Sequence, residues 1–238
     1  VYKRQTAKKI DKKEIDRRIR LAQIYNKTLD PSKLADPYSE KEKKNAISEY
    51  ARMLEVKEKI GHVEIPKINQ DLPIYAGTSE EVLQKGVGHL EGTSLPVGGK
   101  STHTVLTAHR ELHTAKLFTD LNKMKKGDVF YIHNIKEVLA YKVIDVFAVE
   151  PSDFDKVLVV EGKDYCTLLT CTPYMINSHR LLVRAERTEY NPAAVEKDLV
   201  SQVTGKYKIY LIISLIIIAI LLWYYISQRR RNKNIEIK

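Results

Sequence analysis

Residues 167–184 of this chain read TLLTCTPYMINSHRLLVR and predict a strand, a short loop and a second strand. The β-branched and apolar side chains that lead up to Cys171 are typical of a strand. Pro173 ends that strand because it lacks the N–H that a strand ladder needs. An Asn-Ser pair then favours a turn, and a second strand begins at Arg180. The chain therefore brings Cys171 and Arg180 together across a short loop.

A cysteine and an arginine at facing strand ends form a chemically specific pair. A thiolate is a good nucleophile toward a carbonyl carbon, and the oxyanion that results needs fixed hydrogen-bond donors. The guanidinium of Arg180 supplies such donors and stays protonated at physiological pH. Residue types alone also allow a second interpretation, in which Cys171 is a buried structural cysteine and Arg180 ends a strand without a chemical role.

Positive charge lies at the two ends of the 238-residue chain. Residues 1–27 hold ten basic and three acidic side chains, and residues 227–238 hold five and one, within a net charge of +10. The part between is close to neutral, which argues against a nucleic-acid-binding surface. Basic ends fit a location beside an anionic membrane or cell wall. We therefore expect a globular protein whose partners do not include nucleic acid.

The two cysteines, Cys166 and Cys171, lie five residues apart on one predicted strand. Their side chains point to opposite faces, so they are poorly placed for a mutual disulfide. Nothing near them has the spacing of zinc ligands, and no metal site is predicted.

Many short strands separated by turns predict a mainly β fold, a closed β-barrel within residues 59–192. The expected strands are 62–66, 73–75, 102–108, 129–135, 137–149, 165–171 and 180–187. Short peripheral helices are expected at 78–85, with a capping box of Thr78 and Glu81, and through 116–119. Five glycines and a proline predict a loop at 86–99.

Two helices joined by a proline-bearing loop are predicted in residues 1–58. Residues 8–28 have the apolar spacing of an amphipathic helix. Two Asp-Pro steps break the pattern in residues 29–38, and Ser39 then caps a second helix. The simplest interpretation of the loop is a linker between helices. Because the sequence begins at Val1, we expect a removed or omitted segment before it.

An uncharged apolar run at 209–226 predicts a transmembrane helix. As a helix it would span ~27 Å, close to the ~30 Å of a hydrocarbon core. Aromatic residues flank both ends, and the basic tail 227–238 follows. With 193–208 as a juxtamembrane linker, the positive-inside rule predicts a single-pass anchor in the cell membrane, a cytoplasmic tail and an extracellular barrel on the wall side. A buried core helix is the alternative.

His109 is the candidate acid–base residue among seven histidines. It follows the predicted strand 102–108, where its side chain would project from the rim of a barrel. His179 is a rival beside Arg180, but adjacent residues on a strand point to opposite faces. A single histidine is more often structural than catalytic.

The motif Thr-Leu-x-Thr-Cys, with Arg nine positions after the Cys, resembles the signature of sortases, cysteine transpeptidases of Gram-positive cell surfaces. The string from Thr170 to Arg184 is similar to the pilin-polymerising class C members, and so is the stretch 109–121 that begins at His109. Further similar stretches are Val63-Glu-Ile-Pro66, Leu95-Pro-Val-Gly-Gly99 and Asp36-Pro37-Tyr38. The resemblance covers roughly residues 15–190 and implies a sortase-type β-barrel.

This resemblance also implies roles for individual residues. Cys171 attacks the Thr carbonyl of an LPxTG-like sorting signal, Arg180 binds the carbonyl and the oxyanion, and His109 protonates the leaving Gly amine. The acceptor is a Lys amine of the next pilin subunit, and no metal or organic cofactor takes part. Thr170 and Leu106 are candidate substrate-binding residues.

Asp36, Pro37 and Tyr38 match the lid that covers the site in class C sortases. We expect Asp36 to pair with Arg180 and the Tyr38 ring to lie against the Cys171 sulfur. The chain also departs from the class C pattern, with Glu111 in place of the usual Gly, His113 in place of Pro and Ala185 in place of Gly. The first two departures concern the shape of the loop after His109.

Other functions fit some of these features. A housekeeping sortase would join surface proteins to peptidoglycan, although the lid and the C-terminal anchor argue against it. A non-catalytic, membrane-anchored module could bind anionic wall polymers through its basic ends. A papain-like protease is disfavoured because the order of its Cys, His and Asn residues is absent.

Overall fold

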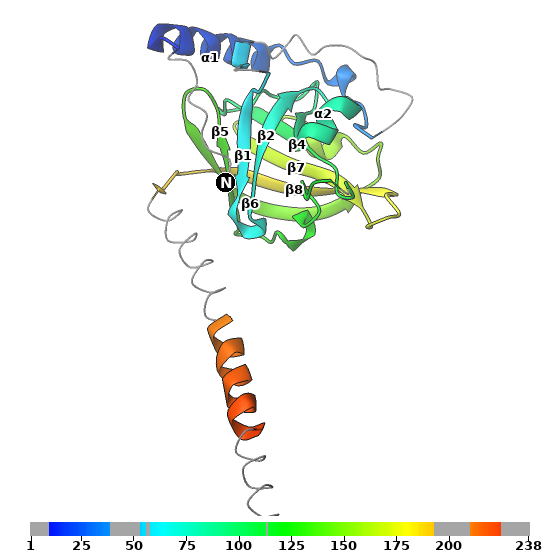
Figure 1. Cartoon of the computed structure of the whole chain (residues 1–238). Coiled ribbons are helices and arrows are strands. Elements are labelled where there is room, and N and C mark those ends of the chain that lie inside the picture. The colour runs from blue at the N-terminus through cyan, green and yellow to red at the C-terminus, as the bar shows by residue number, and fades with distance from the viewer. Residues whose placement is uncertain (1–9, 39–52, 56–57, 113, 193–209, 225–238) are drawn as a thin grey trace, which may run out of the picture. The chain divides into compact units, whose positions relative to one another are not determined.

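A closed β-barrel forms the core of the first of two units, residues 1–190 and 191–238 (Figure 1). The computed structural model describes residues 10–38, 53–55, 58–112, 114–192 and 210–224. In those residues the strands are β1 (Gly61–Ile65), β2 (Gln70–Ala76), β3 (Val87–His89), β4 (Thr102–Thr107), β5 (Val129–His133), β6 (Val138–Val149), β7 (Asp164–Thr172) and β8 (His179–Thr188). Their order around the barrel is β1-β2-β3-β4-β7-β8-β6-β5. The predicted mainly β, closed barrel is confirmed.

The pairing of β4, β7 and β8 decides which residues share an edge of the barrel. β4 and β7 are parallel, with Thr107 beside Leu169, so both strands end at the same edge. β7 and β8 are antiparallel, so β8 begins where β7 ends. Cys171 is the direct partner of Arg180 in this register, as the strand–loop–strand prediction requires.

Two hydrophobic clusters lie on opposite faces of this part of the sheet. Leu168 belongs to the main cluster, and its neighbour Leu169 to the smaller one, because consecutive side chains of a strand point to opposite faces. The main cluster includes Leu106, Phe118, Phe130, Tyr141, Cys166 and Val183. The smaller cluster consists of Leu90, Val105, Val157, Leu169 and Leu182. Leu34 and Tyr38 pack against it, so the chain before residue 39 covers this second face.

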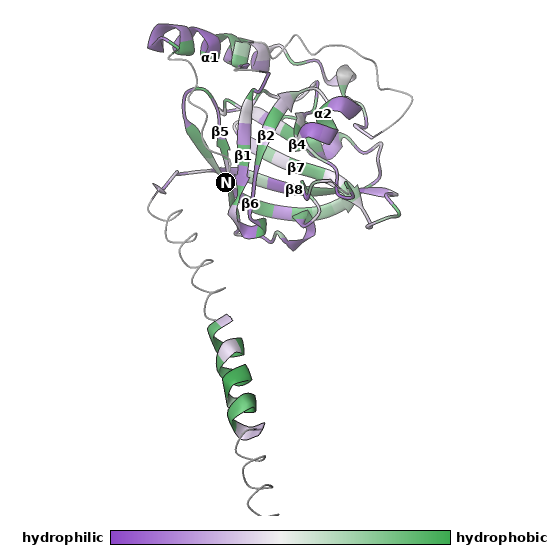
Figure 2. Cartoon of the chain, in the orientation of Figure 1, coloured by the Kyte–Doolittle hydropathy of each residue, from purple (hydrophilic) through white to green (hydrophobic). Residues whose placement is uncertain are grey.

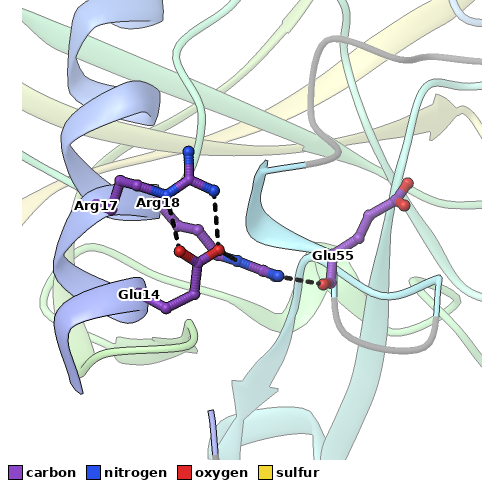
Figure 3. A network of polar contacts seen from close by, with 4 residues as sticks. All are labelled: Glu14, Arg17, Arg18 and Glu55. Carbon is purple, nitrogen blue, oxygen red and sulfur yellow. Dashed lines mark hydrogen bonds and ion pairs between the residues drawn. The ribbon is translucent and has the colours of Figure 1, made fainter. Parts of the chain in front are cut away.

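Helix α1 (Lys12–Lys27) joins the main core through Ile19 and Ala22, both buried, as its amphipathic pattern predicts. Polar contacts also connect one side of α1 to the chain before β1 (Figure 3). Arg18 donates from Nε to the Glu14 carboxylate at 2.8 Å and from Nη1 to the carbonyl oxygen of Glu55 at 3.2 Å. The helix is thereby tied to the segment that leads into β1. The second helix expected from Ser39 falls on residues 39–52, outside the described ranges.

The glycine-rich stretch expected to be a loop contains strand β3. β3 pairs in parallel with β2 and antiparallel with β4, and so closes this side of the barrel. A Cβ on Gly88 would lie 2.5 Å from the carbonyl oxygen of Gly77. Gly88 therefore permits a close approach of two backbones, a use of glycine that composition alone does not separate from a loop.

Two local predictions about helices were wrong. Helix α2 (Glu80–Lys85) is capped by Ser79, whose side chain accepts from the Val82 N–H at 3.4 Å, so Thr78 does not form the predicted cap. Residues 117–120 form a turn followed by a 3₁₀ helix at Leu121–Lys123 in place of the short helix through 116–119. The reason is a contact between distant residues: Phe118 donates its N–H to the His109 carbonyl at 3.1 Å.

In the second unit, residues 210–224 of the expected membrane segment are helical, and most of their side chains are apolar (Figure 2). None of the helices in the described ranges has both the length and the apolar character that a membrane crossing requires. The expected linker 193–208 and tail 227–238 lie outside the described ranges.

Asn26 is expected to anchor α1 to the loop before β4. Its side chain is buried, accepts from the Leu95 N–H at 2.7 Å and donates to the Leu95 carbonyl at 3.2 Å. Asn26→Ala should lower the free energy of unfolding by ~1–3 kcal/mol, because a buried N–H loses its partner. Urea unfolding measures the change. The control Gln23→Ala, on the exposed side of α1, should stay within about 0.5 kcal/mol of the wild type; equal stability of Asn26→Ala would contradict the anchor.

Candidate active site

Arg180 is held from two sides at the barrel edge. Its Nη1 donates to the carbonyl oxygens of Asn177 at 2.9 Å and His179 at 3.0 Å. Its other edge donates from Nε and Nη2 to the two carboxylate oxygens of Asp36, at 2.8 and 2.7 Å. The Asp36 pairing predicted from sequence is therefore confirmed. The side chains are 9% and 13% exposed, so this charge-assisted pair is more buried than a surface ion pair.

Tyr38 fills the space between the histidine and the arginine. Its hydroxyl donates to the Ala108 carbonyl at 2.6 Å and shares a 2.8 Å hydrogen bond with the Thr107 hydroxyl. The ring centre lies 5.2 Å from the guanidinium carbon of Arg180 and 5.6 Å from the centre of the His109 ring. The Tyr38 ring thus contacts the two other candidate catalytic residues, and its predicted contact with the Cys171 sulfur stays a prediction. Pro37, between Asp36 and Tyr38, is buried.

The Cys171 thiol is held in its neutral form. Burial raises its pKa to about 11 and is the largest influence. The positive charge of Arg180 lowers this pKa, while the carboxylates of Asp36 and Glu111 raise it. The covered site therefore keeps a protonated thiol at neutral pH, and the thiolate that nucleophilic attack needs is suppressed.

His109 reaches the same edge because β4 runs parallel to β7. The pairing continues one residue past β4, where the Ala108 N–H donates to the Leu169 carbonyl at 3.3 Å, and His109 follows. Nε2 of the His109 ring lies 3.2 Å from a carboxylate oxygen of Glu80 in α2, and the two atoms share a hydrogen bond. The rival His179 lies 3.2 Å from Glu150, with its side chain 43% exposed. The geometry favours His109 as the acid–base candidate.

Arg110 is a contributor that the sequence did not single out. Its guanidinium is buried and donates from Nη1 to the Thr172 hydroxyl at 3.0 Å and to the Cys171 carbonyl at 3.4 Å. Its Nε donates to the Thr119 carbonyl at 3.4 Å. Arg110 therefore fixes the end of β7 that carries the thiol. Its position directly after His109 was the only sequence signal.

The two predicted substrate-binding residues are fully buried in this structure. Thr170 donates its hydroxyl to the Ala108 carbonyl at 2.8 Å, and Leu106 lies in the main core. Neither can contact a substrate in this arrangement, because neither presents surface. Cys166 is also buried and free, and burial raises the pKa of its thiol well above the usual value. Its place in the core fits a structural role.

Comparison with known proteins identifies the fold that carries this site. Residues 63–188, more than half of the chain, match the sortase domain family. The chain belongs to the sortase family. Sortase C-1 from Streptococcus pneumoniae is 62% identical with a TM-score of 0.75, and the match covers 77% of this sortase and 94% of that chain. A pilus-related Sortase C of Group B Streptococcus is 60% identical with a TM-score of 0.74, over 77% and 94% of the two chains.

More distant curated relatives match a smaller part of their own length. Sortase A of Bacillus anthracis is 33% identical over 135 residues, which are 56% of this chain and 61% of that protein. The match to Sortase D of Bacillus subtilis covers 54% of that protein, so this sortase spans little more than half the length of these relatives. The predicted resemblance to class C sortases is confirmed by the two sortase C structures, of which the one from Group B Streptococcus is described as pilus-related.

Removing the contacts of Asp36 and Tyr38 should expose the thiol. Asp36→Ala with Tyr38→Ala should speed labelling of Cys171 by a neutral thiol reagent, because burial and the Asp36 charge both raise its pKa. The pH of half-maximal labelling should fall below about 11. The melting temperature should fall by only a few degrees, since Tyr38 packs against the smaller cluster while the main core of the barrel is untouched.

Two control variants show which cysteine is labelled. Cys166→Ala should label like its parent, whereas Cys171→Ala should remove labelling. A double variant that labels at the wild-type rate would show that residues 36–38 do not cover the thiol.

Proposed function

We propose that this sortase is a cysteine transpeptidase that cleaves an LPxTG-like sorting signal between Thr and Gly and joins the acyl group to a pilin Lys amine. The observation that carries the proposal is the cross-strand pairing of Cys171 with Arg180, with His109 at the same barrel edge. The likeness to structures described as pilus-related sortase C supports the choice of pilin substrates.

The first half of the reaction forms a thioester. The Cys171 thiol gives its proton to His109, and its sulfur bonds to the Thr carbonyl carbon. Nε and Nη2 of Arg180 hold the oxygen that becomes negative. As the Thr–Gly C–N bond breaks, His109 protonates the leaving Gly amine.

The second half transfers the acyl group. A neutral Lys amine attacks the thioester carbon, and His109 accepts the proton that the amine loses. The C–S bond breaks, and the thiolate of Cys171 recovers a proton from His109. The product is an isopeptide bond, and all the proton movements are accounted for by the thiol, the imidazole and the two amines.

Residues 36–38 act as a lid in this proposal. Asp36 occupies the Nε and Nη2 donors of Arg180 that the substrate oxygen would use. The Tyr38 ring lies against both Arg180 and His109. The sorting signal must therefore displace the lid, and such loop openings take place on μs–ms timescales.

The location that we propose is the cell membrane. The apolar run at 209–226 and the basic tail 227–238 support a single-pass anchor with the barrel on the wall side. In that arrangement residues 1–58 carry the lid, residues 59–192 form the catalytic barrel and residues 193–208 link it to the anchor.

Replacing Arg180 tests the chemistry. Arg180→Lys should keep the fold and lower turnover ~100- to 1000-fold, because an ammonium cannot reproduce the planar fork that holds the oxyanion. Trapping the thioester with a tagged sorting peptide, followed by transfer to a pilin, measures each half-reaction. Arg184→Lys is the matched control on the same strand and should be milder.

Wild-type rates in Arg180→Lys would remove Arg180 from the mechanism. Transfer to a peptidoglycan cross-bridge amine in preference to a pilin Lys would identify a housekeeping sortase.

The topology has its own test. Protease added to wall-stripped protoplasts that express the full chain should digest the barrel and spare the tail, detected by antibodies to each. A protected barrel would reverse the proposed orientation.

A further inference from the structure

The loop between the nucleophile strand and Arg180, residues 173–178, has little apolar packing to hold it. Tyr174, Met175 and Ile176 are 52%, 71% and 69% exposed. A cavity of about 320 Å³ opens beside the loop, lined by Tyr174 on one side and by Glu111 and Leu112 among others. The position of this loop must therefore depend on specific polar contacts.

Glu111, which also lines this cavity, supplies such contacts. One carboxylate oxygen accepts from the backbone N–H of Met175, and the other accepts from the side-chain amide of Asn177 at 3.1 Å. Met175 and Asn177 both have positive φ, at 66° and 59°, so the clamp formed by the Glu111 carboxylate contacts the loop at two residues with left-handed backbone. Two oxygens of one carboxylate thus fix two points of the loop.

The clamp leads directly to Arg180. The Asn177 carbonyl accepts from Nη1 of Arg180 at 2.9 Å. When the lid is closed, Asp36 orients the other edge of the guanidinium. When the lid opens, that support is lost, and the carbonyls of Asn177 and His179 remain to orient Arg180. The orientation of the open-state donors therefore depends on the loop, and the loop depends on Glu111.

We propose that Glu111 is a positioning residue that clamps the β7–β8 loop, so that Arg180 keeps its Nε and Nη2 donors aimed at the substrate once the lid has opened. The inference rests on the proposed function of Arg180 as the oxyanion donor. The resemblance to class C sortases implies Gly at this position, which has no side chain, so the clamp would come from the Glu side chain that this chain has there.

The Glu111 carboxylate also raises the pKa of the Cys171 thiol, and so disfavours the thiolate. The charged groups that face Cys171 are Arg180 and Arg110, which lower its pKa, and Asp36 and Glu111, which raise it. Neutralising Glu111 should therefore favour the thiolate while loosening Arg180. Because unfolding would also expose the thiol and increase its labelling, the melting temperature has to be measured beside these two effects to separate a positioning role from a loss of folded protein.

Glu111→Ala and Glu111→Gln test the proposal in the full chain, assayed with a tagged sorting peptide. Glu111→Ala should lower kcat by about 10- to 100-fold through misplaced donors, with a melting temperature within about 2 °C of the wild type. Glu111→Gln keeps an acceptor for Met175 and should recover part of the rate. In both variants the pH profile of Cys171 labelling should move to lower pH. Glu161→Gln, which removes an exposed carboxylate before β7, is the matched control and should change neither readout.

A double-mutant cycle tests whether Glu111 affects the rate through Arg180. In an Arg180→Lys background, Glu111→Ala should lower the residual rate less than about twofold, because the clamp acts through the guanidinium. In an Asp36→Ala background its effect should persist, because the clamp acts after the lid has opened. Full activity of Glu111→Ala alongside an impaired Arg180→Lys would overturn this inference alone; an Arg180→Lys enzyme with wild-type rates would overturn the proposed function as well.

Discussion

The Arg180 guanidinium joins three separate parts of the chain. It lies opposite Cys171 across the β7–β8 pair. Its Nη1 donates a hydrogen bond to the loop between those strands, and its other edge donates hydrogen bonds to Asp36. A planar group with donors on both edges can hold a carboxylate on one edge and two carbonyls on the other, a geometry that the single nitrogen of an ammonium cannot reproduce. One side chain therefore connects Asp36, the loop between β7 and β8, and the strand position of Cys171.

The barrel makes this arrangement possible. The parallel pairing of β4 with β7 brings the ends of two strands to one edge, and the antiparallel pairing of β7 with β8 brings the start of a third. Cys171 lies on β7 and Arg180 on β8, and His109 lies two residues past the end of β4. The three residues are thus positioned by backbone ladders, while Arg110 fixes the end of β7 through the Thr172 hydroxyl.

In the proposed mechanism, the closed lid would lower reactivity by burial as well as by blocking access. Burial is the largest influence that raises the pKa of Cys171 to about 11, and Asp36 adds to it while occupying the donors of Arg180. Opening the lid would therefore expose the thiol, lower its pKa and free the oxyanion donors in one movement. Under the proposed function, the same few contacts would couple substrate binding to activation of the nucleophile.

The sequence by itself determined the parts that depend on neighbouring residues or on a shared motif. Alternating side chains and Pro173 predicted the turn that joins Cys171 to Arg180, and the resemblance singled out His109 and Asp36. Only the tertiary structure decided the rest. Strand β3 forms where Gly88 lets two backbones approach closely. Glu111 contacts the loop because Met175 and Asn177, which are 64 and 66 positions away in sequence, fold back onto it. Contacts of that kind join residues far apart in sequence, and local patterns contain no information on which distant groups the barrel will bring together.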